Sequence, residues 1–297
     1  MRCHLLCVPC TVRAAYDIAT KATDDEELQR KVVTQTLKRL SENHSFTSMT
    51  PTMLHTYAFR LAQKITGNRD PFIKLKSESN RIVMNLIPLL KSEYEKQSPN
   101  NAFRFAALGA ICGNSIDFEV EGYKVSMEDL ERSLINCLKG NLTLDDTPKL
   151  MDALSKSKLV IYFLDNAGEI AFDKFFIKVI TENYPVKVLS AVKSGPIMND
   201  ATLEDALQVR LDEVTEVIPT GSDSIGLKLD ECSEDFLRSL READLIIAKG
   251  QGYYESISEI EHVLQKPIVY MLRAKCSLVA KSLNVHPGAN IVKFVNY

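Results

Sequence analysis

The segment Leu159–Phe163 (LVIYF), followed directly by Leu164–Glu169 (LDNAGE), decides the fold class that we predict for this chain. The first segment is apolar and β-prone, and it predicts a short buried strand. Apolar residues then recur at helical spacing from Ile170 to Ile180, which predicts a helix immediately after the turn. The turn between a parallel strand and its helix lies at the carboxyl edge of the sheet, where open α/β folds bind their ligands.

The rest of the second half repeats this alternation of strand and helix. We predict strands at residues 159–164, 186–192, 215–219, 244–248, 268–272 and 290–295. We predict helices between most of them, at residues 168–182, 202–210, 233–242, 254–264 and 275–283. Alternating elements of this kind favour an α/β fold with a mostly parallel sheet and helices on both faces.

The first half of the chain has a helical period instead. Thr23–Glu26 has the pattern of a capping box, and Thr50-Pro51 and Asp70-Pro71 each place a capping residue before proline. Pro88 lies inside the long helix that follows Asp70-Pro71, and we expect it to kink or break that helix. Further helices are predicted at 102–111 and 127–138. We therefore expect an all-helical domain over residues 1–145 and an α/β domain over residues 146–297.

The composition is that of an ordinary globular protein. The chain has 297 residues, 45% of them hydrophobic and 25% charged, which is enough for two domains. A net charge of −3 provides no basic surface for nucleic acid, and no apolar run is long enough to span a membrane. The first residues lack the apolar core of a secretory signal. Seven cysteines, an odd number scattered along the chain, fit reduced thiols in a cytoplasmic protein better than a disulfide framework.

Acidic and basic side chains follow different strands but meet at the same predicted edge of the sheet. Asp165 and Asn166 follow the strand at 159–164, and Asp200 follows the next strand along the chain. Lys249 and Lys275 follow two later strands. Because carboxylate and amide oxygens are hard ligands, the first three residues favour magnesium or manganese over zinc. A phosphate group would bridge such a cation and the two lysines.

This arrangement predicts hydrolysis of a phosphate ester. A divalent metal neutralises the charge on the ester oxygens and lowers the pKa of bound water, which then acts as the nucleophile. A nearby carboxylate orients or deprotonates that water, and Asp165 and Glu169 are the candidates for this catalytic role. Lysine side chains and amides at helix N-termini hold the remaining oxygens.

Each of these features, taken singly, also fits a purely structural role. Asp165–Gly168 fits an ordinary turn, Asn199-Asp200 fits a helix cap, and the two lysines fit solvated surface charges. The coincidence of several such features on one sheet edge favours a functional site. The chain has no P-loop motif and no Gly-x-Ser-x-Gly elbow, and Gly250–Glu255 lacks the third glycine of the dinucleotide-binding pattern.

The N-terminal cysteines form a separate motif. Cys3, Cys7 and Cys10 have the spacing Cys-x3-Cys-x2-Cys and are candidates for a second metal site or a redox site. Zinc binding would need a fourth ligand such as His4 or Cys112. An iron–sulfur cluster and a redox dithiol at a helix start are the other functional interpretations. Thiols that simply pack at a helix N-terminus explain the pattern equally well.

Several motifs together make the chain resemble a known family over nearly its whole length. They are Cys7–Cys10, Thr66–Pro71, Gly113–Phe118, Asp165–Glu169, Asn199-Asp200 and Lys249–Glu255. The chain resembles the family called domain of unknown function 89, the damage-control phosphatases, and in particular its microbial cysteine-bearing branch. The resemblance implies a helical N-terminal domain on a Rossmann-like, three-layer α/β/α domain. It also implies metal-dependent phosphatase activity on small phosphorylated metabolites such as sugar phosphates, with manganese, cobalt, nickel or magnesium.

The resemblance further implies roles for particular residues. The family's metal ligands fall on Asp165, Asn166 and Asp200, and its phosphate-binding lysine falls on Lys275. Its glycine-rich substrate loop falls on residues 250–255. The substrate-binding positions are then Asn114, Asp117, Lys249, Gly250, Gly252, Glu255 and Lys275. This chain reads Leu-Arg-Ala-Lys at 272–275, where related members with a defined sugar-phosphate preference carry Arg-Thr-x-Lys.

Two other functions remain alternatives. One relative has been described as a carboxyl methyltransferase, which would use S-adenosylmethionine, and the missing glycine-rich loop after the strand at 159–164 argues against it. A protein that binds a metal or a phosphometabolite without turnover is the second alternative. The sequence predicts neither the particular substrate nor the oligomeric state.

Overall fold

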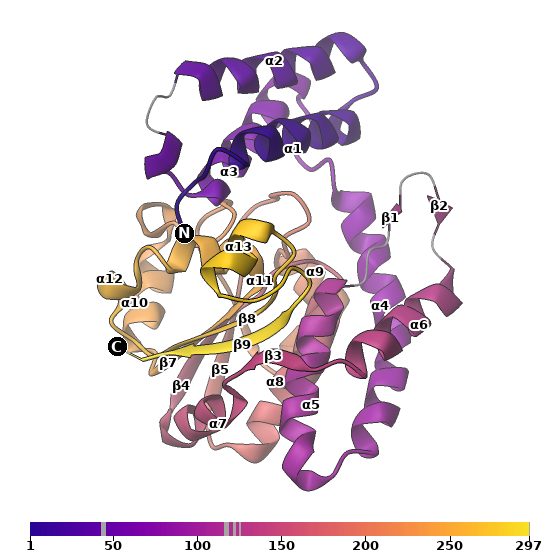
Figure 1. Cartoon of the computed structure of the whole chain (residues 1–297), viewed down its shortest axis with the longest axis vertical. Helices are drawn as coiled ribbons and strands as arrows, with labels where there is room; N and C mark the ends of the chain where they lie inside the picture. Colours follow the sequence, from indigo (N-terminus) through magenta and orange to yellow (C-terminus); the bar gives the residue numbers. More distant parts are fainter. Residues whose placement is uncertain (43–45, 116–118, 121–122, 125, 297) are drawn as a thin grey trace.

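A seven-stranded sheet forms the centre of the computed structural model, which describes residues 1–42, 46–115, 119–120, 123–124 and 126–296 (Figure 1). The strand order is β3-β9-β8-β7-β4-β5-β6. The strands are β3 (Leu142–Asp145), β4 (Leu159–Phe163), β5 (Lys187–Val192), β6 (Glu216–Pro219), β7 (Leu245–Lys249), β8 (Ile268–Arg273) and β9 (Asn290–Val295). Neighbouring strands pair in parallel except β8 and β9, which are antiparallel. The predicted α/β fold with a mostly parallel sheet is therefore confirmed.

Helices cover both faces of this sheet, so the architecture has three layers (Figure 1). One face packs against α4 (Ile73–Glu95), α5 (Pro99–Cys112), α6 (Met127–Leu138), α7 (Thr147–Lys156), α8 (Ile170–Asn183) and α9 (Leu203–Gln208). The other face packs against α10 (Glu234–Glu242), α11 (Gly250–Ile257) and α13 (Ser277–Ser282), with α12 (Glu261–Leu264) beside them. The central strands are buried on both sides, which explains their nearly continuous apolar sequences.

Three N-terminal helices, α1 (Cys7–Ala22), α2 (Glu26–Glu42) and α3 (Pro51–Thr66), form a cap of their own (Figure 1). The cap covers loops that follow the sheet strands. Ile197, from the loop after β5, belongs to the apolar core of the cap. The backbone N–H of Ile225, after β6, donates to Thr56 Oγ1 of α3 at 3.0 Å. The cap therefore lies over the carboxyl edge of the sheet, where the site was predicted.

The first half of the chain contains strands as well as helices. The short strand β3 ends at Asp145, and it pairs with β9 inside the main sheet. A two-stranded hairpin, β1 (Glu119–Val120) with β2 (Tyr123–Lys124), also lies before residue 146. The four residues of β3 alternate apolar and polar over too short a segment to predict a strand, and their pairing partner lies at the far end of the chain. The sheet therefore begins before the boundary that we predicted at residue 146.

Two local predictions need correction. Of the two outcomes expected at Pro88, a kink or a break, the break does not occur, since α4 runs without interruption from Ile73 to Glu95. The cysteines are not all reduced, because Cys112 at the end of α5 forms a disulfide with Cys137 of α6. That bond also excludes Cys112 as a fourth zinc ligand. The cysteines at positions 3, 7, 10, 232 and 276 have free thiols.

Candidate active site

The turns after β4 and β5 are joined by backbone hydrogen bonds. The Ala201 N–H donates to the carbonyl oxygen of Asp165 at 2.8 Å, and the Ala167 N–H donates to Asn199 O at 2.9 Å. Asn166 and Asp200 face each other as an isolated antiparallel bridge. Neighbouring parallel strands thus bring the predicted ligands Asp165, Asn166 and Asp200 together at one edge of the sheet.

Asp165 is buried in a crowded acidic environment. Burial raises the pKa of its carboxyl well above the ordinary value, and the charges of Glu169 and Asp200 raise that pKa further. Gly250 packs directly against this carboxylate, because a Cβ at Gly250 would lie 1.9 Å from Asp165 Oδ2. Gly250 also has a φ of +77°, which other residues rarely adopt. Glycine at position 250 thus makes room for the carboxylate.

Lys249 and Glu169 form a buried ion pair beside Asp165. The Lys249 ammonium donates to Glu169 Oε1 and to Asp173 Oδ1, both at 2.6 Å, and to Ala110 O at 3.0 Å. Its side chain has no exposed surface. Burial lowers the pKa of Lys249, but the charges of Asp173 and Glu169 outweigh this effect and raise that pKa. Since an ammonium has three N–H groups, these acceptors leave none for a substrate.

A second buried lysine accompanies Asp200. Lys193 Nζ lies 3.6 Å from Asp200 Oδ2 and donates to Gly226 O at 2.6 Å. It also lies 4.2 Å from the centre of the Tyr253 ring, a cation–π contact. Burial raises the pKa of the Asp200 carboxyl to about 6, and Lys193 opposes that rise. Glu169 and Asp200 therefore each have a lysine, whereas the side-chain oxygen Oδ2 of Asp165 accepts hydrogen bonds from amides.

Those amides belong to Asn114 and Asn166. The Asn114 side chain donates to Asp165 Oδ2 at 2.8 Å and to Glu169 Oε2 at 2.7 Å. The Asn166 side chain donates to the same two oxygens at 2.8 and 3.2 Å. Asn114 comes from the short 3₁₀ turn that follows α5, so the helical first half of the chain contributes a side chain to this cluster. Asp117 lies outside the described residues.

Several residues at the site were missed by the sequence analysis. Asn80 of α4 accepts the Gly168 N–H at 2.6 Å and holds the turn after β4. Asp173 of α8 accepts from Lys249 and from the Tyr162 hydroxyl, each at 2.6 Å. Lys193, which pairs with Asp200, follows β5 directly. The sequence signal that could have indicated Asp173 is an acidic residue inside the otherwise apolar segment that forms α8.

The predicted substrate loop forms the first turn of α11. Gly250 and Gly252 both lie there, and Gly252 packs against Ile225 of the loop after β6. The Cys276 N–H donates to Gln251 Oε1 at 2.9 Å, which joins this turn to the segment after β8. Lys275 is exposed on that segment. Glu255 is half-buried, and burial raises its pKa to about 7.

The donor chemistry fits a hard divalent cation. The carboxylates of Asp165 and Asp200 and the amide oxygen of Asn166 are oxygen donors, and a positive ion would relieve the crowding of negative charge that raises the pKa of Asp165. Among the described residues, no cluster of three or more His, Cys, Asp or Glu side chains is arranged to hold a metal ion. An ion between these residues would therefore complete its coordination with water and substrate oxygens.

The N-terminal cysteines lie near one another but differ in exposure. Cys3 and Cys7 are buried in a small apolar cluster with Leu40 and Leu54, and Cys10 is exposed. Burial raises the pKa of the Cys3 thiol to about 12 and also raises the pKa of the Cys7 thiol. This arrangement agrees with the interpretation that the thiols pack at the N-terminus of a helix and bind nothing.

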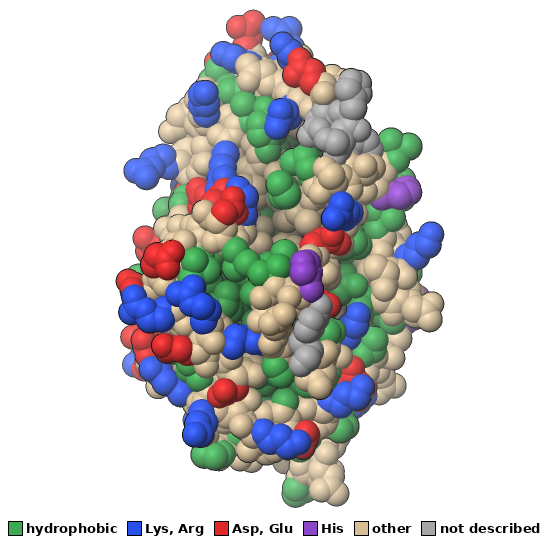
Figure 2. All heavy atoms as spheres, turned by 90° about the vertical axis from the view of Figure 1, so that its left-hand side faces the viewer, with side chains coloured by type: hydrophobic (Ala, Val, Ile, Leu, Met, Phe, Trp, Pro, Cys, Tyr) green, Lys and Arg blue, Asp and Glu red, His purple; other side chains and the backbone are tan. Residues whose placement is uncertain are grey.

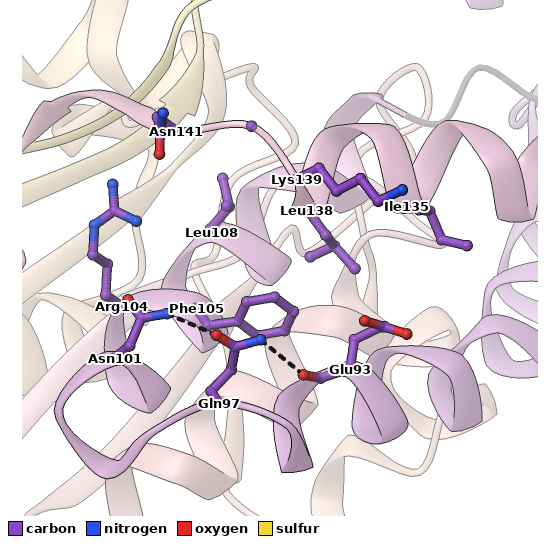
Figure 3. Close-up of a pocket in the computed structure, with 11 residues that line it drawn as sticks. Glu93, Gln97, Asn101, Arg104, Phe105, Leu108, Ile135, Leu138, Lys139 and Asn141 are labelled. Carbon is purple, nitrogen blue, oxygen red and sulfur yellow. Dashed lines mark hydrogen bonds between the residues drawn. The ribbon is translucent and has the colours of Figure 1, made fainter.

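A separate cavity of about 290 Å³ lies between α4, α5, α6 and the start of β3. Figure 3 shows it, with Arg104, Phe105 and Leu108 of α5 on one side and Leu138 of α6 on the other. The Asn101 side chain donates to Gln97 Oε1, and the Gln97 side chain donates to Glu93 O. None of the predicted site residues lines this cavity, so its size does not make it the reaction centre.

The surface shows no concentration of one charge on the face drawn in Figure 2, where basic and acidic side chains are interspersed. This agrees with the small net charge of −3.

No helix in the described part of the chain is both long enough and apolar enough to cross a membrane.

Comparisons with known proteins define the class of this protein. The family model of the damage-control phosphatase ARMT1-like domain matches residues 3–291. The chain therefore belongs to this family of damage-control phosphatases, and the predicted resemblance is confirmed.

Individual relatives agree with this assignment. The chain is 35% identical to a damage-control phosphatase of Archaeoglobus fulgidus, over 99% of this chain and 100% of the relative. It is 38% identical to an uncharacterised protein of Methanocaldococcus jannaschii, over 96% of this chain and 93% of that one. The crystal structure of a DUF89 family protein from Pyrococcus horikoshii superposes with a TM-score of 0.88 at 34% identity, covering 98% of both chains. Family membership indicates a phosphatase role.

Proposed function

We propose that the protein is a metal-dependent phosphomonoesterase that hydrolyses small phosphorylated metabolites. One observation carries the proposal. Asp165, Glu169 and Asp200 are buried together, and the two lysines among them pair with Glu169 and Asp200. In the described part of the chain these two lysines do not bond to the Asp165 carboxylate, whose pKa is raised first by burial and then by repulsion from Glu169 and Asp200, and a divalent cation would relieve that repulsion.

The roles that we propose follow from these contacts. Asp165, Asn166 and Asp200 would hold the cation, which when bound supplies positive charge to the ester oxygens and lowers the pKa of water. Glu169 is held by Lys249 and Asn114, and its fixed carboxylate accepts a proton from the attacking water. The backbone amides at the start of α11 and the side chain of Lys275 would bind phosphate oxygens.

Lys249 receives a different role from the one predicted. We propose that it is a positioning residue, because its N–H groups are directed at Glu169, Asp173 and Ala110. It orients the carboxylate of Glu169 and neutralises a charge that would otherwise be buried without a partner. Substrate binding by positive charge then falls to Lys275 rather than to Lys249.

The experiment is a phosphate-release assay of the purified protein against a panel of phosphometabolites with manganese, cobalt, nickel or magnesium. The wild type should release phosphate only when a divalent ion is present. Asp165→Asn should lose at least about a hundredfold in kcat, since the variant keeps the shape of the turn and removes the charge. Asp212→Asn changes an exposed acid that makes none of the site contacts described above; it is the matched control and should retain full activity.

The same assay separates the alternatives. Full activity of Asp165→Asn would refute the ligand assignment. Tight binding of a phosphometabolite without release of phosphate would favour a binding protein. Transfer of a methyl group from S-adenosylmethionine would favour the methyltransferase.

A further inference from the structure

The end of α5 is built into the active site. The carbonyl oxygen of Ala110 accepts a hydrogen bond from Lys249. A Cβ at Gly113 would lie 3.1 Å from Glu169 Cγ and 2.8 Å from the Phe172 ring, so this turn packs directly on α8. Asn114 then donates to Asp165 and Glu169. A shift of this turn would therefore displace hydrogen-bond donors from both carboxylates.

Cys112 lies within this same turn, between Ala110 and Asn114. Its disulfide to Cys137 joins the end of α5 to the last turn of α6, with a sequence separation of 25 residues. Cys137 Sγ also lies 3.9 Å from Arg273 Nη1 and from Asn290 Nδ2. The bond therefore ties α5 and α6 to the carboxyl end of β8.

The two helices share one apolar core that contains Leu108, Leu134 and Leu138, and a cavity lies at the edge of this core. The cavity of about 290 Å³ in Figure 3 opens between Leu108, one turn before Cys112, and Leu138, the residue after Cys137. Empty space beside the helix ends gives them room to shift when the covalent link is opened. The disulfide adds a covalent constraint to the packing between the end of α5 and α6.

We propose that Cys112 and Cys137 are positioning residues, and that their disulfide holds Asn114 on the site carboxylates so that thiol–disulfide exchange controls phosphatase activity. Cys112 is fully buried and Cys137 is 8% exposed, so an incoming thiolate reaches the Cys137 sulfur first. The guanidinium of the neighbouring Arg273 attracts that thiolate. The proposal rests on the phosphatase function proposed above.

The exchange is balanced with a dithiol as the reductant. One thiolate of the dithiol attacks Cys137, the bond to Cys112 breaks, and Cys112 takes up a proton as a thiol. The second thiol of the reductant then displaces Cys137 and forms a cyclic disulfide. The protein gains two electrons and two protons, and the dithiol loses the same.

The first test counts thiols. The chain has seven cysteines, and with two of them in the disulfide the denatured, unreduced protein should react as five free thiols. Treatment with dithiothreitol should raise this count to seven. A count of seven without reductant would overturn the proposal.

The second test measures how reduction of the disulfide changes kcat. Dithiothreitol should lower kcat of the wild type by about tenfold, because small displacements of positioned groups have effects of this size. The double variant Cys112→Ser/Cys137→Ser should start at the lowered rate and should not respond to the reductant. Cys232→Ser, which removes a free thiol elsewhere, is the matched control and should respond like the wild type.

The variant Asn114→Ala tests whether the disulfide affects kcat through the position of Asn114. This variant should have a lowered kcat and should lose most of its response to dithiothreitol, since the disulfide acts through Asn114. An unchanged tenfold response in Asn114→Ala, or wild-type kcat in the double cysteine variant, would refute the proposed role.

Amide hydrogen exchange provides a readout that does not depend on catalysis. Reduction should increase exchange at residues 110–114 and leave the central strands β4 and β7 protected. If the wild type released no phosphate from any ester, the proposed function would fail, while this measurement and the thiol count would still test the tether. Unchanged hydrogen exchange at residues 110–114 after full reduction would overturn the proposal that the disulfide holds this turn in place.

Discussion

At the residue scale, the geometry of the site depends on the residues that contact Asp165 and its neighbour Glu169. Gly250 leaves room for the carboxylate, Asn114 and Asn166 donate to it, and Lys249 holds the neighbouring Glu169. None of these contacts involves residues close together in the sequence except the pair 165 and 166. The residue types were visible in the sequence, but their partners were not.

Gly250→Ala should abolish most activity and destabilise the fold by several kcal/mol. The new Cβ would overlap Asp165 Oδ2, and the φ of +77° is strained for alanine. Gly67→Ala is the matched control, because Gly67 has a similar φ of +74° and no atom within 4 Å of its new Cβ. We expect this control to lose only about 1 kcal/mol in chemical denaturation. Equal losses in both variants would show that backbone strain alone, without the clash, explains the effect.

Glu255 should make stability depend on pH. Burial raises its pKa in the folded chain to about 7 from 4.5, so the folded state binds the proton more tightly than the unfolded state. Its contribution to the free energy of unfolding is therefore largest below pH 4.5 and is lost as the pH rises through 7.

Removal of this charge should therefore stabilise the protein at high pH. Relative to the wild type, Glu255→Gln should gain roughly 1–3 kcal/mol at pH 8 and much less at pH 4.5, measured by urea denaturation. The exposed Glu242→Gln is the control and should show no such difference between the two pH values. A gain at pH 4.5 as large as at pH 8 would contradict the argument.

At the scale of elements, local sequence signals located the helices and strands well. The apolar segment at β4 and the periodic segment at α8 gave the strand–turn–helix unit that carries the site. Prediction failed at β3, whose four residues become a strand only by pairing with β9. It also failed at Pro88, where packing of Val83, Leu86 and Leu90 in the core keeps α4 continuous despite the proline.

Pro88→Ala should therefore stabilise the protein. Position 88 is exposed, and alanine restores the backbone N–H and removes the clash that proline brings to a helix interior. We expect a gain of roughly 1–3 kcal/mol in the free energy of unfolding. Lys91→Ala, at another exposed position of α4, should change stability by less than about 0.5 kcal/mol. A loss of stability in Pro88→Ala would show that the proline contributes to the native shape of α4.

At the scale of the whole molecule, the cap of α1–α3 is anchored to the loops that form the site. Ile197 enters the cap core, Arg60 of α3 forms ion pairs with Asp223 and Glu231, and Thr56 binds the backbone at Ile225. The Asp200 N–H in turn donates to Ile197 O at 3.0 Å. The packing of the cap and the position of Asp200, which we propose as a metal ligand, are therefore coupled.

Ile197→Ala tests this coupling. The side chain is fully buried, so its truncation should destabilise the protein by about 2–4 kcal/mol. It should also lower phosphate release well below the wild-type rate at a temperature where the variant remains folded. Leu203→Ala is the control, since Leu203 is 43% exposed and should lose less than about 1 kcal/mol with normal activity. Destabilisation without any loss of activity would show that the cap and the loop are independent.

The sequence by itself determined the alternation of strand and helix and placed Asp165, Asn166 and Asp200 at one edge of the sheet, where we propose the site. These features depend on the period of apolar residues and on turn chemistry, which act over a few neighbouring positions. Only the tertiary structure decided that Lys249 turns inward to Glu169, that Asn80 and Asp173 support the site, and that Cys112 bonds to Cys137. Those contacts join segments far apart in the chain, and their geometry is set by how the helices pack on the sheet.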